Sequence, residues 1–108
     1  MSCKIKTKKY NNVQLLKISG EIEAPDINTI SKKLESLVKS NYHTIAVDLN
    51  EVKYIDSHGL GVFVYFWKMM EEKNRELVFV KPRGVIKTIF EGTNLYQILH
   101  IVDNLEDL

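Results

Sequence analysis

One stretch near the middle of the chain constrains the fold most, because it joins a strand pattern directly to a helix pattern. Residues 44–49 (TIAVDL) are mostly β-branched and apolar, which is typical of a strand. Residues 60–70 carry apolar side chains at helical spacing. The polar loop between them, residues 54–61 (YIDSHGLG), contains two glycines. The stretch therefore predicts a strand, a tight loop and a helix, an arrangement whose first helical turn can bind an anion.

Ser57 stands where the N-cap of this helix is expected. Its hydroxyl would accept a hydrogen bond from one of the unpaired amides in the first turn. The same amides and the helix dipole favour an exposed negative charge by about 0.3 to 1 kcal/mol. A phosphate on Ser57 would therefore meet a receptive site, although it would have to displace the cap. From the residues alone, a plain serine cap on a core helix explains the loop at least as well.

The helix after the loop is apolar on two faces. One face is expected to pack on the sheet and contains Leu60, Phe63, Val64 and Trp67. The opposite face contains Val62, Tyr65, Phe66 and Met69. One sheet covers only the first face, so the second must meet a neighbouring helix, a second subunit of a weak homodimer or a protein partner. If it is exposed, it marks an interaction surface beside Ser57.

The segments before and after this stretch alternate between strand and helix patterns. Before it, we expect an edge strand over residues 3–9, a turn over residues 10–12, a strand over residues 13–19, and a helix from Pro25 to about Lys39. After it, we expect a strand over residues 77–80, a helix from Pro82 with Gly92 as C-cap, mixed signals over residues 95–102 and a last turn over residues 104–108. This alternation predicts an α/β fold with right-handed crossovers.

Size and charge exclude several classes of protein. A chain of 108 residues is long enough for one core, so we expect a single domain over residues 1–108. The net charge of +1 gives no electrostatic basis for nucleic-acid binding, and Lys4, Lys6, Lys8 and Lys9 are expected on a solvated strand edge. Cys3 is the only cysteine, so no intramolecular disulfide forms. Without a secretion signal or an apolar run of about 20 residues, we expect a cytoplasmic protein that has no membrane partner.

An enzymatic role is not expected. Asp56, Ser57 and His58 are consecutive, and consecutive side chains do not line up as a hydrolytic triad. Ile55 stands where a nucleophile elbow requires glycine. His43 and His100 lack companions at metal-ligand spacing, and no phosphate-loop or dinucleotide motif is present. We therefore predict no catalytic residues, no metal and no cofactor.

Several short motifs, in a fixed order, resemble the STAS domain family. They are residues 20–22 (GEI), residues 47–49 (VDL), residues 52–64 (VKYIDSHGLGVFV) and residues 85–95 (VIKTIFEGTNL). The likeness is greatest to the bacterial anti-sigma factor antagonists, and it covers nearly the whole chain. It implies a STAS-like domain with a central mixed β-sheet of about four to five strands and about four helices.

The resemblance also implies a phosphorylation switch. Ser57 matches the phosphorylated serine of the family. The unphosphorylated form would bind an anti-sigma factor that is also the serine kinase, and a metal-dependent serine phosphatase would reverse the modification. His58 departs from the family pattern, which usually has serine or threonine there. The residues expected to contact the partner are Asp56, Ser57, His58, Gly59, Gly61, Val62 and Phe66.

The roles of individual loop residues have alternatives. Asp56 would shape the loop and support the serine, or serve as a simple turn or cap carboxylate. Gly59 and Gly61 would let the partner backbone approach, or would pack tightly on the sheet. The whole chain would alternatively be a STAS scaffold that works without phosphorylation, within a signalling assembly or a lipid-transport complex.

Overall fold

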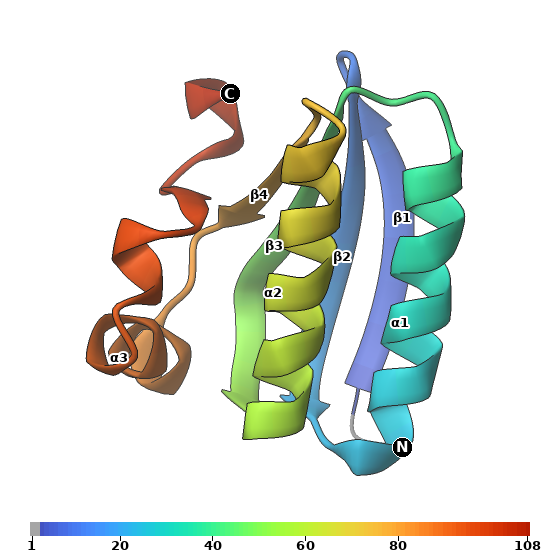
Figure 1. The fold of residues 1–108 in the computed structure, drawn as a ribbon. Helices are drawn as coiled ribbons and strands as arrows, with labels where there is room; N and C mark the ends of the chain where they lie inside the picture. Colours follow the sequence, from blue (N-terminus) through green and yellow to red (C-terminus); the bar gives the residue numbers. More distant parts are fainter. Residues whose placement is uncertain (1–2) are drawn as a thin grey trace.

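Five strands form a mixed sheet, and three α-helices pack against one of its faces (Figure 1). The computed structural model describes residues 3–108. The elements in chain order are β1 (Cys3–Tyr10), β2 (Val13–Ile22), α1 (Ala24–Lys39), β3 (Thr44–Ile55), α2 (Ser57–Glu72), β4 (Glu76–Val80), α3 (Gly84–Gly92) and β5 (His100–Val102). Two short 3-10 helices, η1 (Leu95–Gln97) and η2 (Leu105–Asp107), lie near the C-terminus. This architecture confirms the predicted α/β fold, with three α-helices and two 3-10 turns where about four helices were expected.

The strands lie side by side in sequence order, from β1 to β5. β1 and β2 form the predicted antiparallel hairpin, whose turn uses Asn11 with a φ of 54°. The remaining neighbours are parallel and are joined by helices. When each crossover leads to the next strand in the same direction, right-handed connections place every helix on the same face of the sheet. The opposite face therefore has no α-helix within residues 3–108.

The main core lies between the sheet and the helices. Aromatic rings cross it, with the Phe63 and Phe79 centroids 5.2 Å apart and the Phe79 and Phe90 centroids 6.2 Å apart. A smaller apolar cluster lies on the helix-free face and contains Leu15, Ala46, Val78 and Val80. The C-terminal segment packs onto this cluster through Leu105. The consecutive apolar residues of β3 are thus buried on both sides of the sheet.

Several element boundaries differ from the sequence prediction. β2 and β3 both extend beyond their predicted ends, because residues 51–55 of β3 continue to pair with residues 19–22 of β2 after a bulge. α3 begins at Gly84 rather than Pro82, since Gly84 has a φ of 55° that an α-helix interior does not adopt. Gly92 is the last residue of α3, and Thr93 is its C-cap.

Arg75 connects the end of α1 to the start of β3. Its guanidinium donates hydrogen bonds to the carbonyl oxygens of Val38 at 2.6 Å, Ser40 at 3.0 Å and Tyr42 at 2.5 and 3.0 Å. A planar group with five donors can satisfy several carbonyls at once. This contact holds the loop at the end of the sheet opposite Ser57, where α2 returns to β4 (Figure 1).

The orientation of α2 differs from the prediction. Phe63 is buried as expected, whereas Leu60, Val64 and Trp67 are half-buried. Phe66, which the sequence placed on the opposite face, is buried, and so is Met70. α1 lies beside α2 on the same face of the sheet and contacts it, so the buried stripe of α2 includes the side toward α1 (Figure 1). Packing against a neighbouring helix, one of the predicted alternatives, therefore explains the burial of Phe66.

Candidate functional site

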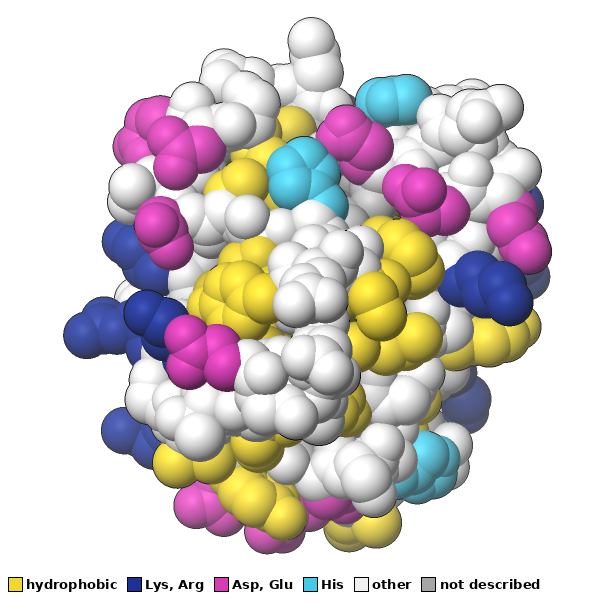
Figure 2. All heavy atoms as spheres, turned by 60° about the vertical axis from the view of Figure 1, so that its left-hand side comes forward, with side chains coloured by type: hydrophobic (Ala, Val, Ile, Leu, Met, Phe, Trp, Pro, Cys, Tyr) yellow, Lys and Arg dark blue, Asp and Glu magenta, His cyan; other side chains and the backbone are white. Residues whose placement is uncertain are grey.

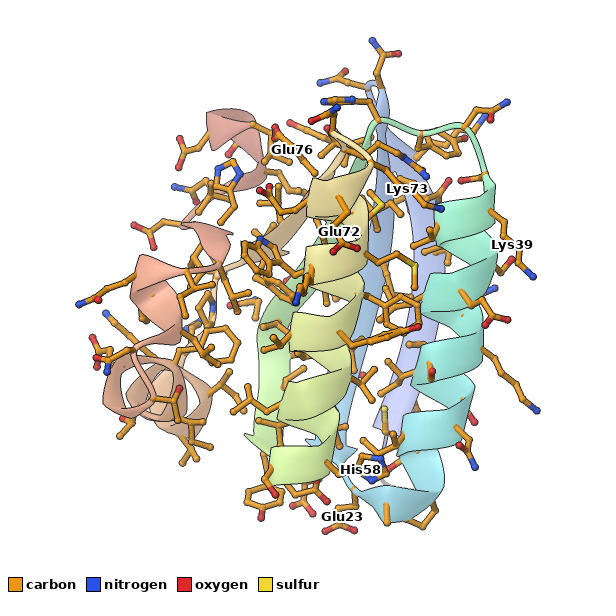
Figure 3. The ribbon with its side chains drawn as sticks, viewed as in Figure 1. Glu23, Lys39, His58, Glu72, Lys73 and Glu76 are labelled. Atoms are coloured by element: carbon orange, nitrogen blue, oxygen red, sulfur yellow. The ribbon has the colours of Figure 1, made fainter. Side chains whose placement is uncertain are left out.

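The predicted site lies where β2 and β3 end and where α1 and α2 begin. Parallel strands place their C-terminal ends at the same edge of the sheet, and each is followed here by the first turn of a helix. His58 in the first turn of α2 and Glu23 before α1 both lie at this end of the molecule (Figure 3). The polar loop of the sequence is thus brought next to the β2–α1 junction.

Asp56, not Ser57, is the N-cap of α2. Its backbone is extended, with a φ of −90° and a ψ of 175°, and its carboxylate oxygen Oδ1 accepts a hydrogen bond from the Gly59 amide at 2.9 Å. Its carbonyl accepts the first helical hydrogen bond, from the Leu60 amide at 3.0 Å. The prediction of a serine cap is therefore wrong. A carboxylate serves well here, because its charge also interacts favourably with the helix dipole.

Ser57 is the first residue of α2, and its side chain is exposed. Because Asp56 caps the helix, a group attached to the serine oxygen would not have to displace the cap. Helical geometry places the exposed residues of this end of α2 on one stripe. We call this stripe, with half-buried Val62 at its border, the α2 surface: Ser57, His58, Gly61, Val62 and Tyr65.

Tyr65 is the large side chain of the α2 surface. It is 61% exposed, and its ring lies edge-on to Phe66, with the centroids 5.1 Å apart. The sequence had placed Phe66 among the partner-contacting residues. The structure contradicts that role, because Phe66 is only 2% exposed. Tyr65 and Phe66 belonged to the same predicted apolar face. The sequence pattern did not show which of the two rings is exposed.

Gly59 is also unavailable to a partner, because it is buried between three isoleucines. A Cβ on Gly59 would lie 2.9 Å from Cγ1 of Ile55, 3.0 Å from Cδ1 of Ile27 and 3.2 Å from Cγ2 of Ile22. The tight-packing alternative therefore holds for this glycine, although its contacts come from α1 as well as from strand ends. Gly61 is different: it is exposed, and a Cβ there would have no neighbour within 4 Å.

Replacing Gly59 with alanine is expected to destabilise the protein by about 1–2 kcal/mol. Overpacking of a core costs about 1–3 kcal/mol, and the gain in helix propensity of up to about 1 kcal/mol offsets part of it. Gly61→Ala is the matched control and is expected to raise the stability by about 0.5–1 kcal/mol. Urea unfolding of both variants measures the difference. Equal stabilities of the Gly59→Ala and Gly61→Ala variants would show that the start of α2 does not need close packing at Gly59.

The surroundings of the site carry negative charge. Asp56 lies directly before Ser57, and Glu21 and Glu23 are exposed at the neighbouring end of β2. The backbone amide of Glu23 bonds to the buried Asp26 carboxylate at 3.3 Å, within a capping box at the start of α1. Burial, and then the charge of Asp26, raises the pKa of the Cys3 thiol. A phosphate on Ser57 would therefore add to the negative charge at this end of the molecule. His58 is the basic side chain next to it in the sequence.

Comparison with known proteins identifies the family. The model of the STAS domain matches residues 4–108. An anti-sigma-B factor antagonist of Listeria monocytogenes is 32% identical over 101 residues, which are 94% of this chain and 88% of the relative.

Solved structures share the fold of this chain. The crystal structure of an anti-sigma factor antagonist from Mycobacterium paratuberculosis has a TM-score of 0.89 at 18% identity, with 98% of this chain and 90% of that chain covered. The anti-sigma factor antagonist SpoIIAA in its unphosphorylated form has a TM-score of 0.80 at 14% identity, with 96% and 92% covered, and SpoIIAA has also been solved in its phosphorylated form. No helix within residues 3–108 is long and apolar enough to cross a membrane. The chain belongs to the STAS domain family, among relatives that are anti-sigma factor antagonists.

Proposed function

We propose that this protein is an anti-sigma factor antagonist of the cytoplasm, controlled by phosphorylation of Ser57. In its unphosphorylated form it binds an anti-sigma factor that is also a serine kinase, and the sigma factor is released. Phosphorylation of Ser57 blocks this binding, and a metal-dependent serine phosphatase restores it. The observation that carries the proposal is the exposed Ser57 hydroxyl at the start of α2, beside the exposed ring of Tyr65.

The α2 surface has the composition of a protein contact. Tyrosine is enriched among the residues that dominate binding energy at interfaces, because it supplies a large contact area with few rotatable bonds. Gly61 adds no side chain between Ser57 and Tyr65, so a partner can approach the helix backbone there. His58 occupies the position where the resemblance leads us to expect serine or threonine. We propose that His58 contributes to the choice of kinase.

The electrostatics of the site explain how a phosphate would oppose binding. A phosphoserine adds a charge of about −1.5 to −2 at pH 7. At Ser57 this charge would join Asp56, Glu21 and Glu23 at the same end of the molecule. Bringing such a charge into a partly apolar contact brings a desolvation penalty, and a penalty of about 1.4 kcal/mol already lowers affinity tenfold.

Incubation of the protein with its cognate anti-sigma factor kinase and ATP tests the proposal. We expect one phosphate to be incorporated per chain, on Ser57, as measured by intact mass and peptide mapping. Ser57→Ala should abolish incorporation. Ser36→Ala, which removes an exposed serine on α1, should leave it unchanged. Equal labelling of Ser57→Ala and the unmodified sequence would refute the assignment.

A phosphorylation-independent scaffold is the second candidate. It is supported by exposed apolar residues away from α2, namely Val85 on α3 at 53% and Ile98 after η1 at 52%. Figure 2 shows the side of the molecule where α3 and the C-terminal segment lie, and hydrophobic side chains gather in the middle of that face. A complex whose affinity is unchanged by Ser57→Asp but lost in Val85→Glu would favour the scaffold role.

A further inference from the structure

The helix-free face of the sheet carries a row of lysines at its β1 edge. Side chains of β1 alternate between the two faces, and Cys3 and Ile5 pack into the core on the helix side. Lys4, Lys6 and Lys8 therefore project from the opposite face, and all three are exposed. This spacing is regular, because positions two residues apart on a strand are separated by about 6.7 Å.

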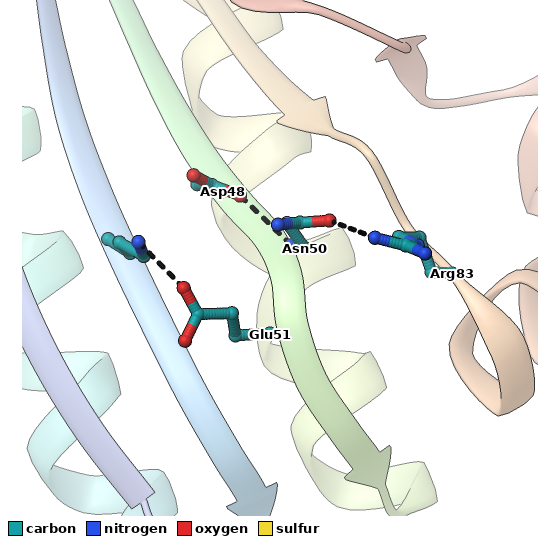
Figure 4. Close-up of polar contacts among 5 residues, drawn as sticks. Asp48, Asn50, Glu51 and Arg83 are labelled. Carbon is teal, nitrogen blue, oxygen red and sulfur yellow. Dashed lines mark hydrogen bonds and ion pairs between the residues drawn. The ribbon is translucent and has the colours of Figure 1, made fainter.

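The acidic groups near the row on this face are Asp48 and Glu51, and each of them bonds to a group outside the row. Lys17 on β2 lies directly opposite Lys6, and like charges opposite one another destabilise a strand pair. Nζ of Lys17 bonds to Glu51 at 2.8 Å, and Asp48 accepts a hydrogen bond from the Asn50 amide at 2.9 Å (Figure 4). The hydrogen bond and charge of Lys17, with the charges of Lys6 and Lys53, lower the pKa of Glu51.

Among the ion pairs found in residues 3–108, none includes Lys4, Lys6 or Lys8. These lysines border a hollow of about 710 Å³ on the helix-free face, which Leu15 and Leu105 also line. β1 is at the same time an outer strand, with β2 on one side only. Its other edge presents backbone N–H and C=O groups that can pair with an additional strand.

We propose that β1 binds an extended acidic peptide segment of another protein, which adds to the sheet as an outer strand. Its carboxylates, at alternate positions, would pair with Lys4, Lys6 and Lys8, because both strands repeat every two residues. A nucleic acid or an anionic membrane fits this face less well. Such a broad polyanion would also meet Asp48 and Glu51 on β3, whereas a strand beside β1 meets the lysines. This site lies outside the α2 surface and does not depend on Ser57.

A peptide titration tests the proposal. The full chain is titrated with a synthetic peptide in which glutamate and threonine alternate, and binding is measured by amide NMR and calorimetry. We expect binding that weakens with added salt, shifts centred on β1, and new exchange protection for the β1 amides that do not bond to β2. Three exposed ion pairs that each strengthen binding about twofold multiply to about eightfold. Replacement of Lys4, Lys6 and Lys8 by glutamine should weaken binding by that factor.

The matched control removes three exposed lysines from helices: Lys32, Lys33 and Lys87 are replaced by glutamine. It should bind the peptide as the unmodified chain does. Equal weakening in both triple variants would overturn the proposal, as would a lack of binding by the unmodified chain. Binding of double-stranded DNA or anionic vesicles through the same lysines, without protection of the β1 edge, would also overturn it. If the lysines instead serve only to prevent edge-to-edge association of β1, the variant without Lys4, Lys6 and Lys8 will aggregate, and the unmodified chain will not bind the peptide.

Discussion

Replacing Phe66 with alanine is expected to lower the free energy of unfolding by about 3–5 kcal/mol. Phe66 is buried between α2 and the rest of the core, so its removal loses both apolar burial and packing contacts around the cavity that remains. A domain of this size has a net stability of about 5–15 kcal/mol, so the loss is a large fraction of the total. Urea unfolding followed by circular dichroism gives the value.

The neighbouring residue provides the control. Tyr65→Ala removes an equally large ring that is mostly exposed, so we expect a stability loss of about 1 kcal/mol or less. Tyr65→Ala should instead have its large effect on binding. We expect it to weaken the complex with the anti-sigma factor at least tenfold, which corresponds to a loss of roughly 1.4 kcal/mol. If Phe66→Ala proves as stable as Tyr65→Ala, then α1 does not cover α2 as described.

Ser57→Asp is expected to weaken the complex with the anti-sigma factor kinase by about tenfold or more. The aspartate places a single negative charge where a phosphate would place nearly two, next to the Asp56 carboxylate. Like charges brought together at an interface cost several kcal/mol when they are desolvated, and less at an exposed rim. Calorimetry with the purified kinase, in the absence of ATP, measures the change.

Ser57→Asn separates charge from shape. Asparagine has nearly the same size as aspartate but carries no charge, so this variant should keep most of the affinity. Ser36→Asp adds the same charge on α1, outside the α2 surface, and should bind as the unmodified chain does. Equal losses in the asparagine and aspartate variants would assign the effect to side-chain volume and would remove the electrostatic basis of the switch.

Much of the fold could be predicted from the sequence because its signals were local. Asn11 and Asn12 between two strand patterns specified the hairpin, and Pro25 with the apolar stripe from Ile27 specified α1. The extensions of β2 and β3 were missed because they depend on pairing between distant segments after a bulge. The start of α3 was missed because the left-handed backbone of Gly84 leaves no clear trace in the residue pattern.

The candidate site could be placed in the chain from the sequence, but its details could not. The positions of the loop and of Ser57 follow from the strand–loop–helix pattern, whereas the choice between two adjacent capping residues depends on the backbone at Asp56. Likewise, helical spacing grouped Tyr65 with Phe66, and only the position of α1 decides which ring is buried. The burial of Gly59 arises from Ile22, Ile27 and Ile55, which come from three different elements.

We propose that the exposed hydroxyl of Ser57 controls a protein contact made by the start of α2. The most direct measurement is a calorimetric titration of the cognate anti-sigma factor kinase, without ATP, with unmodified protein and with protein phosphorylated on Ser57. We expect a specific complex with the unmodified protein and an affinity at least a hundredfold lower after phosphorylation, equivalent to about 2.7 kcal/mol. Equal affinities for the two forms would contradict the claim.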